Sequence, residues 1–142
     1  MDYLDTSVLV ALFIPEPDSA AVRAWFDARP AGSFAISDWT LVEFASAMGI
    51  KVRTGALSPA QARSARSLMN QLATESLRVI VPTRDDYARA AGYLGRHELA
   101  LRAGDALHAA ITQSESRIRL VTLDRRLIDA GRKLKIRIVS PI

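Results

Sequence analysis

Short apolar runs alternate with helix-like segments along the chain, and this alternation limits the fold more than any other feature. Five runs have the length of strands, and they lie at residues 1–4, 34–37, 77–81, 118–122 and 136–139. The segments between them repeat apolar residues at the three- and four-residue spacing of a helix. Strands that alternate with helices favour a parallel sheet, because each crossover carries a helix back over the sheet. We therefore expect an α/β fold with one parallel sheet between helical layers.

Several helix ends can be predicted from residues that cap or interrupt helices. Pro15 should end a helix that begins at Ser7, because proline cannot continue the helical hydrogen bonding. The side chains of residues 17–19 and of Asp38 are predicted N-caps for the next two helices. Gly55 is the predicted C-cap of the helix that Asp38 opens. Further helices are predicted to begin at Ser58, Thr83, Ala103 and Asp124.

The length and composition favour one globular domain over residues 1–142. The chain has 142 residues, 49% of them hydrophobic, which is enough to bury a sizeable core. It contains no cysteine, so disulfides and thiolate metal sites are excluded. The apolar run at residues 8–14 has no basic residue before it and is too short to span a bilayer. We expect a cytoplasmic protein without a membrane partner.

The charge balance is basic, with 19 Lys and Arg residues against 15 Asp and Glu residues and a net charge of +4. Such a balance favours a polyanionic partner. The alternative is that the many arginines and alanines reflect a GC-rich genome. Charge alone therefore leaves nucleic-acid binding open.

Four acidic residues lie where predicted strands give way to helices or early in the helices that follow: Asp5, Glu43, Asp105 and Asp124. Ligands of α/β proteins bind outside the carboxyl ends of parallel strands, where the strand order reverses. Four carboxylates brought together there would repel one another unless a cation lay between them. Mg²⁺ prefers carboxylate oxygens and retains waters for a substrate phosphate. These residues predict a metal site.

Each of these residues also has a purely structural interpretation. An Asp at the start of a helix is more often a cap than a ligand. Glu43 is harder to explain in this way, because an unpaired carboxylate among apolar neighbours is costly. His108 follows Asp105 by three residues, and packing against a neighbouring element is the favoured interpretation. His97 lies in a polar stretch and is expected to be solvated.

At these motifs the chain resembles the PIN domain, and specifically the VapC-type toxin ribonucleases of bacterial toxin–antitoxin systems. The resemblance runs from end to end and rests on four segments in the family's order. These are residues 3–12 around Asp5, residues 37–43 ending at Glu43, residues 101–108 around Asp105, and residues 121–124 ending at Asp124. One such motif would be weak, but four in order are specific.

The resemblance implies a three-layer α/β/α sandwich whose five-stranded parallel sheet has its first and fourth strands adjacent. It implies Mg²⁺- or Mn²⁺-dependent cleavage of single-stranded or looped RNA, a homodimer, and silencing by a cognate antitoxin protein. On this basis Asp5 and Asp105 are the expected direct ligands, with Glu43 and Asp124 completing the pocket. Supporting hydrogen bonds are expected from Thr6 and Thr122, and a phosphate contact from Arg102.

Two other functions share some of these features. A receiver-like phospho-switch also uses an acidic metal pocket, but it needs an Asp after the third strand and a Lys after the fifth, where this chain has Pro82 and Ser140. A catalytically weak PIN-fold module that binds RNA or serves as a scaffold is the second alternative. The intact acids argue against it.

The helical hairpin from Trp39 to about Glu75 carries more apolar residues than one helical layer on a small sheet is expected to bury. They are Leu41, Phe44, Met48, Leu57, Leu68, Met69 and Leu72. Some are expected to form a groove for an antitoxin helix or a homodimer contact. The alternative is that all of them pack inside the domain.

Overall fold

The five apolar runs form one parallel sheet in the computed structural model, which describes all 142 residues. The strands are β1 (Asp2–Leu4), β2 (Phe34–Ser37), β3 (Arg78–Ile80), β4 (Arg119–Val121) and β5 (Ile138–Val139). Their order in the sheet is β3-β2-β1-β4-β5, with β1 and β4 adjacent. The predicted sheet and the predicted neighbours are both confirmed.

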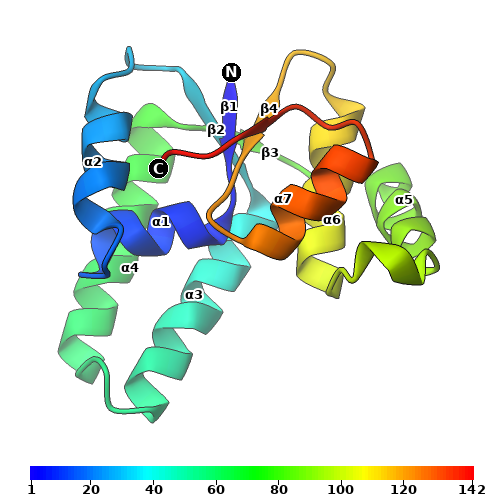
Figure 1. Cartoon of the computed structure of the whole chain (residues 1–142). Coiled ribbons are helices and arrows are strands. Elements are labelled where there is room, and N and C mark those ends of the chain that lie inside the picture. Colours follow the sequence, from blue (N-terminus) through cyan, green and yellow to red (C-terminus); the bar gives the residue numbers. More distant parts are fainter.

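Helices cover both faces of the sheet (Figure 1). One layer contains α1 (Thr6–Phe13), α2 (Ser19–Asp27), α3 (Asp38–Arg53) and α4 (Pro59–Ser76). The other contains α5 (Arg84–Leu94), α6 (Ala103–Ser114) and α7 (Arg125–Lys133), with the short 3₁₀ helix η1 (His97–Leu99) beside α5 and α7. The predicted three-layer sandwich is confirmed. No helix combines the length and the apolar character that crossing a membrane requires.

The central strands are apolar on both faces, which explains why they were recognisable as runs. In β1, Leu4 packs into the core beneath α1–α4, and the preceding Tyr3 packs beneath α5–α7. In β4, Val121 packs beneath α1–α4 and Leu120 packs beneath α5–α7. Side chains of a strand alternate between its faces, so one short run serves both layers.

One predicted cap is wrong, and another lies at the predicted place without its side-chain bond. The N-cap of α3 is Ser37, whose hydroxyl accepts from the Thr40 backbone N–H at 3.3 Å, while Asp38 is the first helical residue. Thr40 completes the cap, since its Oγ1 accepts from the Ser37 N–H at 3.1 Å. Asp18 precedes α2 but makes no side-chain capping bond. At α3, Ser37 therefore has the capping role that the sequence assigned to Asp38.

The predicted C-terminal stop at Gly55 is confirmed. Gly55 adopts φ +78°, a left-handed conformation that glycine reaches without strain. Its N–H donates to the Val52 carbonyl at 3.1 Å, and the Ala56 N–H donates to the Lys51 carbonyl at 2.8 Å. This pair of bonds is the Schellman arrangement, which ends α3 and turns the chain into α4.

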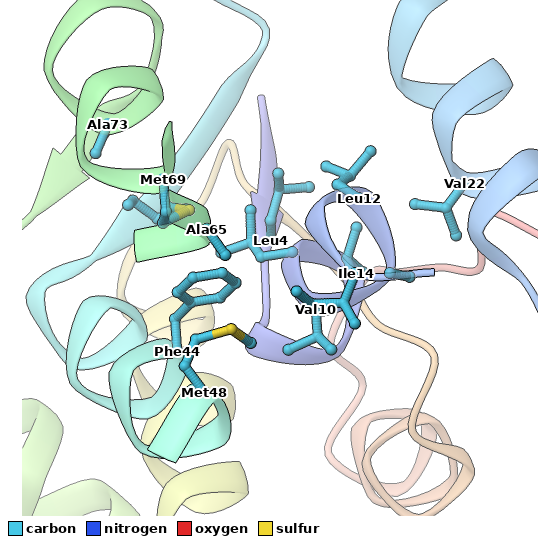
Figure 2. Packing of buried hydrophobic residues seen from close by; sticks show 14 of the residues in the cluster. Leu4, Val10, Leu12, Ile14, Val22, Phe44, Met48, Ala65, Met69 and Ala73 are labelled. Carbon is cyan, nitrogen blue, oxygen red and sulfur yellow. The ribbon is translucent and has the colours of Figure 1, made fainter. Parts of the chain in front are cut away.

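Most of the apolar residues of the hairpin pack inside the domain. Figure 2 shows Phe44, Met48 and Met69 in the core, close to Leu4 and the residues of α1. Leu68 is different, because 54% of it is exposed. It lines a hollow of about 310 Å³ between α1, α2 and α4. Half of the lining is apolar, with Leu12, Phe13, Phe26 and Leu72 beside Leu68, and the other half is polar or charged. A groove therefore exists, although it uses fewer hairpin residues than expected.

Candidate active site

Asp5 lies directly after β1 and is both a helix cap and a cleft residue. Its Oδ1 accepts three bonds: from the Ser7 N–H at 3.0 Å, the Ser7 hydroxyl at 2.6 Å and the Val8 N–H at 3.3 Å. Its Oδ2 accepts one bond, from Thr122 Oγ1 at 2.6 Å. Because a carboxylate oxygen has two lone pairs, Oδ2 keeps one for a further ligand.

Burial raises the pKa of Asp5 above its ordinary value, because only 4% of the residue is exposed. The nearby His108 and the bonds from Ser7 and Thr122 act in the opposite direction. The folded chain therefore resists a bare negative charge at this position. A cation at Oδ2 would relieve that cost.

Thr122 connects the two central strands at the point where their order reverses. It follows β4, is fully buried, and donates to Asp5 after β1. Its Oγ1 also accepts from the Asp124 N–H at 3.0 Å. Asp124 in turn caps α7, since its Oδ1 accepts from the Arg126 N–H at 2.7 Å. The two bonds of the Thr122 hydroxyl explain how Asp5 and Asp124 come to face one cleft.

Glu43 reaches the cleft from the middle of α3. Its Oε2 accepts from Thr6 Oγ1 and is bonded to His108 Nε2, each at 2.6 Å. Burial alone would raise the pKa of Glu43, but the His108 and Thr6 bonds, helped by the nearby Trp39 indole, lower it below its ordinary value. Glu43 is therefore held as an anion.

His108 is packed, as the sequence favoured, but it is also a polar part of the site. It is 1% exposed, and its Nδ1 bonds the Tyr3 hydroxyl at 2.8 Å while Nε2 bonds Glu43. Burial would lower the pKa of His108, yet Tyr3, Glu43 and Asp5 raise it to about 10. The only sequence signal for this role was its position three residues after Asp105.

Asp105 lies in the first turn of α6 and is half-buried. Its Oδ2 accepts from the Arg102 N–H at 3.3 Å. Burial raises the pKa of Asp105, and the negative charges of Asp124 and Glu43 raise it further, against the Arg102 bond and His108. This mutual repulsion is the effect expected of carboxylates gathered in one place.

All four predicted acids line a single cleft of about 300 Å³. Its walls consist of Asp5, Thr6, Ser7, Glu43, Ser46, Ala47, Ile50, Asp105, His108 and Asp124. Thr122 lies behind Asp5 rather than in the wall, and the exposed side chain of Arg102 is also outside it. Sequence reasoning did not assign Ser7, whose hydroxyl bonds Asp5 and accepts from the Leu123 N–H at 3.0 Å.

The donor set suits a hard divalent cation, because every acidic ligand offers oxygen and the cleft contains no sulfur. No three His, Asp or Glu side chains lie close enough together to hold a metal ion without rearrangement. Rotation of the half-buried Asp105 or Asp124, or ligation through waters, would be needed. Mg²⁺ commonly keeps several waters when it binds proteins.

The sequence of the chain matches one known protein family. The sequence matches the PIN domain over residues 3–133. It is 31% identical over 145 residues to ribonuclease VapC35 of Mycobacterium tuberculosis (strain ATCC 25618 / H37Rv), and the match covers 99% of this chain and 97% of that protein. The same values describe its similarity to ribonuclease VapC47 of M. tuberculosis (strain CDC 1551 / Oshkosh).

Solved structures share the fold. The Mycobacterium tuberculosis toxin VapC20, described as cleaving the sarcin–ricin loop, superposes with a TM-score of 0.74 at 20% identity, over 92% of this chain and 95% of that one. The FitAcB structure from Neisseria gonorrhoeae gives a TM-score of 0.70 at 20% identity, over 99% and 98%.

Proposed function

The chain belongs to the PIN-domain family, and on that premise we propose that it is a Mg²⁺- or Mn²⁺-dependent endoribonuclease that acts as the toxin of a toxin–antitoxin pair. One observation carries the proposal: Asp5, Glu43, Asp105 and Asp124, from four separate segments, line one cleft at the reversal of strand order. The similarity to ribonucleases over nearly the full chain supports RNA as the substrate.

Asp5 and Asp105 are the proposed direct ligands of the cation. Asp5 offers Oδ2, the carboxylate oxygen with the fewer hydrogen bonds. Asp105 is less constrained, since its carboxylate accepts only the Arg102 N–H. Glu43 and Asp124 complete the site through water or a second ion. When bound, the cation activates an attacking water and neutralises charge that develops on the phosphate.

The residues of the chain hold the reacting groups in place. Glu43 keeps Oε2 in bonds to Thr6 and His108, which leaves Oε1 to orient the attacking water and accept its proton. Thr122 and Ser7 fix the carboxylate of Asp5. This division of roles lets one carboxylate bind the cation while another handles a proton.

Exposed arginines are the proposed contacts to the RNA backbone. Arg102 precedes α6, and Arg125 and Arg126 open α7, so all three adjoin cleft acids in sequence and are exposed. Arginine pairs well with phosphate oxygens, and such contacts position the substrate without specifying its sequence. The net charge of +4 is consistent with a polyanionic substrate.

An antitoxin and a second copy of the chain are the proposed protein partners. The hollow between α1, α2 and α4, with Leu68 exposed at its edge, suits the apolar face of an antitoxin helix. Val42 is exposed on α3 and is available for a homodimer contact. We place the protein in the cytoplasm, where its RNA substrate and its antitoxin would be.

The substrate class is tested with single-stranded RNA and DNA of the same sequence, incubated with purified protein and Mn²⁺. RNA should be cut at an internal site and DNA should remain intact, and RNA binding should weaken steeply as salt rises. Equal cleavage of both would remove the ribonuclease assignment and leave a metal nuclease. RNA binding without any cleavage would instead favour the RNA-binding or scaffold alternative.

A further inference from the structure

Glu43 is hydrogen-bonded through only one of its two carboxylate oxygens. Thr6 and His108 both contact Oε2, whereas the buried indole N–H of Trp39 lies near enough to lower the pKa of Glu43 but outside hydrogen-bond geometry. Because Thr6 belongs to α1 and His108 to α6, two separate helices fix the same oxygen. The direction in which Oε1 points is therefore determined by the packing of α1 and α6 against α3.

Gly104 provides the space that Oε1 occupies. A Cβ atom at residue 104 would lie far inside van der Waals contact of Oε1 and 3.2 Å from Glu43 Cδ. Gly104 lies in the first turn of α6 and its φ is not in the positive range, so the backbone does not itself require glycine. Glycine is a poor helix former, so helix stability does not explain its presence at residue 104. The close approach of Glu43 does explain it, because only glycine leaves room for Oε1.

His108 lies one turn beyond Gly104 on the same helix. A carboxylate accepts hydrogen bonds but does not donate them, so Nε2 must donate to Glu43 whether the ring is neutral or charged. The Tyr3 hydroxyl, at 2.8 Å from Nδ1, fixes the ring from its other side. Tyr3 is itself bonded to Ser37 Oγ at 2.8 Å, so the ring cannot rotate freely.

We propose that Gly104 and His108 are positioning residues, which together fix the place of the Glu43 carboxylate in the cleft. His108 holds Oε2, and the missing side chain of Gly104 leaves the room that Oε1 fills. The inference rests on the proposed function, because it assigns Glu43 its role in the cleavage reaction. It adds two residues of α6 that act on the reaction through Glu43.

The first test compares Gly104→Ala with Gly92→Ala. Gly92 is a matched control, because it also lies in a helix, α5, and a Cβ there would meet nothing within 4 Å. Gly104→Ala should lower kcat by about 100-fold, since a displacement of about 1 Å in an active site can cost that much. KM for RNA should change little, and Gly92→Ala should cleave like the parent. Parental kcat in Gly104→Ala would overturn the proposal.

The second test uses thermal unfolding of metal-free protein and requires no activity. In the parent, Gly104→Ala should displace the Glu43 carboxylate and weaken its bonds to Thr6 and His108, so its Tm should fall below that of Gly92→Ala. In a Glu43→Ala background the same substitution should raise Tm by about 2–4 °C, because the helix gains alanine at no steric cost. An equal effect of Gly104→Ala in both backgrounds would overturn the proposal. If the parent cleaves no RNA, the proposed function fails, and this cycle still decides whether Gly104 positions Glu43.

The third test separates hydrogen bonding by His108 from its packing. Glutamine can place an N–H where His108 Nε2 lies, whereas leucine cannot. His108→Gln should therefore keep a kcat at least about 10-fold above that of His108→Leu. Similar kcat values in two folded variants would show that the bond to Glu43 has no positioning role.

Discussion

Asp5→Asn and Asp105→Asn are each expected to lower RNA cleavage by more than about 100-fold, because the loss of residues that merely support a ligand already costs about 10–100-fold. Asparagine keeps the size of aspartate and remains a good N-cap, so the side chain of the Asp5→Asn variant can still cap α1. The substitution removes the negative charge of the carboxylate, which the cation needs. Initial rates with saturating Mn²⁺ measure the effect.

The fold should survive these substitutions. Because burial raises the pKa of Asp5, the folded chain binds a proton there more readily than the unfolded chain, and ionisation costs stability as the pH rises past both pKa values. At neutral pH, metal-free Asp5→Asn should therefore have a Tm equal to or above that of the parent. Asp129→Asn, exposed on α7, makes the same charge change and should cleave normally. Near-parental cleavage by either cleft variant would show that the ligand assignment is wrong.

Expression of the chain alone is expected to arrest growth, and co-expression with the small protein encoded beside it should restore growth. The hollow beside Leu68 is the proposed docking site of that partner. Burying a leucine side chain contributes about 1.5–3 kcal/mol. Leu68→Glu should therefore weaken co-purification of the partner while leaving RNA cleavage intact.

Asp5→Asn provides the complementary control in cells. It should no longer arrest growth, yet it should still bind the partner, because Asp5 lies in the cleft and not in the hollow. Normal growth with the active chain alone, and no partner in the purified protein, would contradict the toxin assignment while leaving the nuclease assignment in place.

The sheet and the gathering of the four acids could be predicted because they follow from local patterns. Short apolar runs and helix caps are encoded by neighbouring residues, and parallel strands place their carboxyl ends at one edge. Asp5 and Asp124 are the clearest case, since each closely follows a strand and the strands β1 and β4 are adjacent. The resemblance to the PIN domain supplied the strand order.

The positions of His108 and Gly104 could not be predicted in the same way. Their roles depend on contact with Glu43, which arrives from α3, a helix distant in sequence. His108 looked like a packed residue among alanines, and Gly104 looked like an ordinary residue at the start of a helix. Only the packing of α6 against α3 reveals what each does. The exposure of Leu68 is likewise a property of how helices pack.

The dependence of RNA cleavage on a cation at the four acids is tested by titrating Mn²⁺ into purified protein. Protein freed of metal with a chelator should leave the RNA intact, and added Mn²⁺ should restore cleavage until the rate saturates. Asp5→Asn should remain inactive across the titration. Cleavage at the full rate in the presence of the chelator would show that the reaction does not need a cation at these acids.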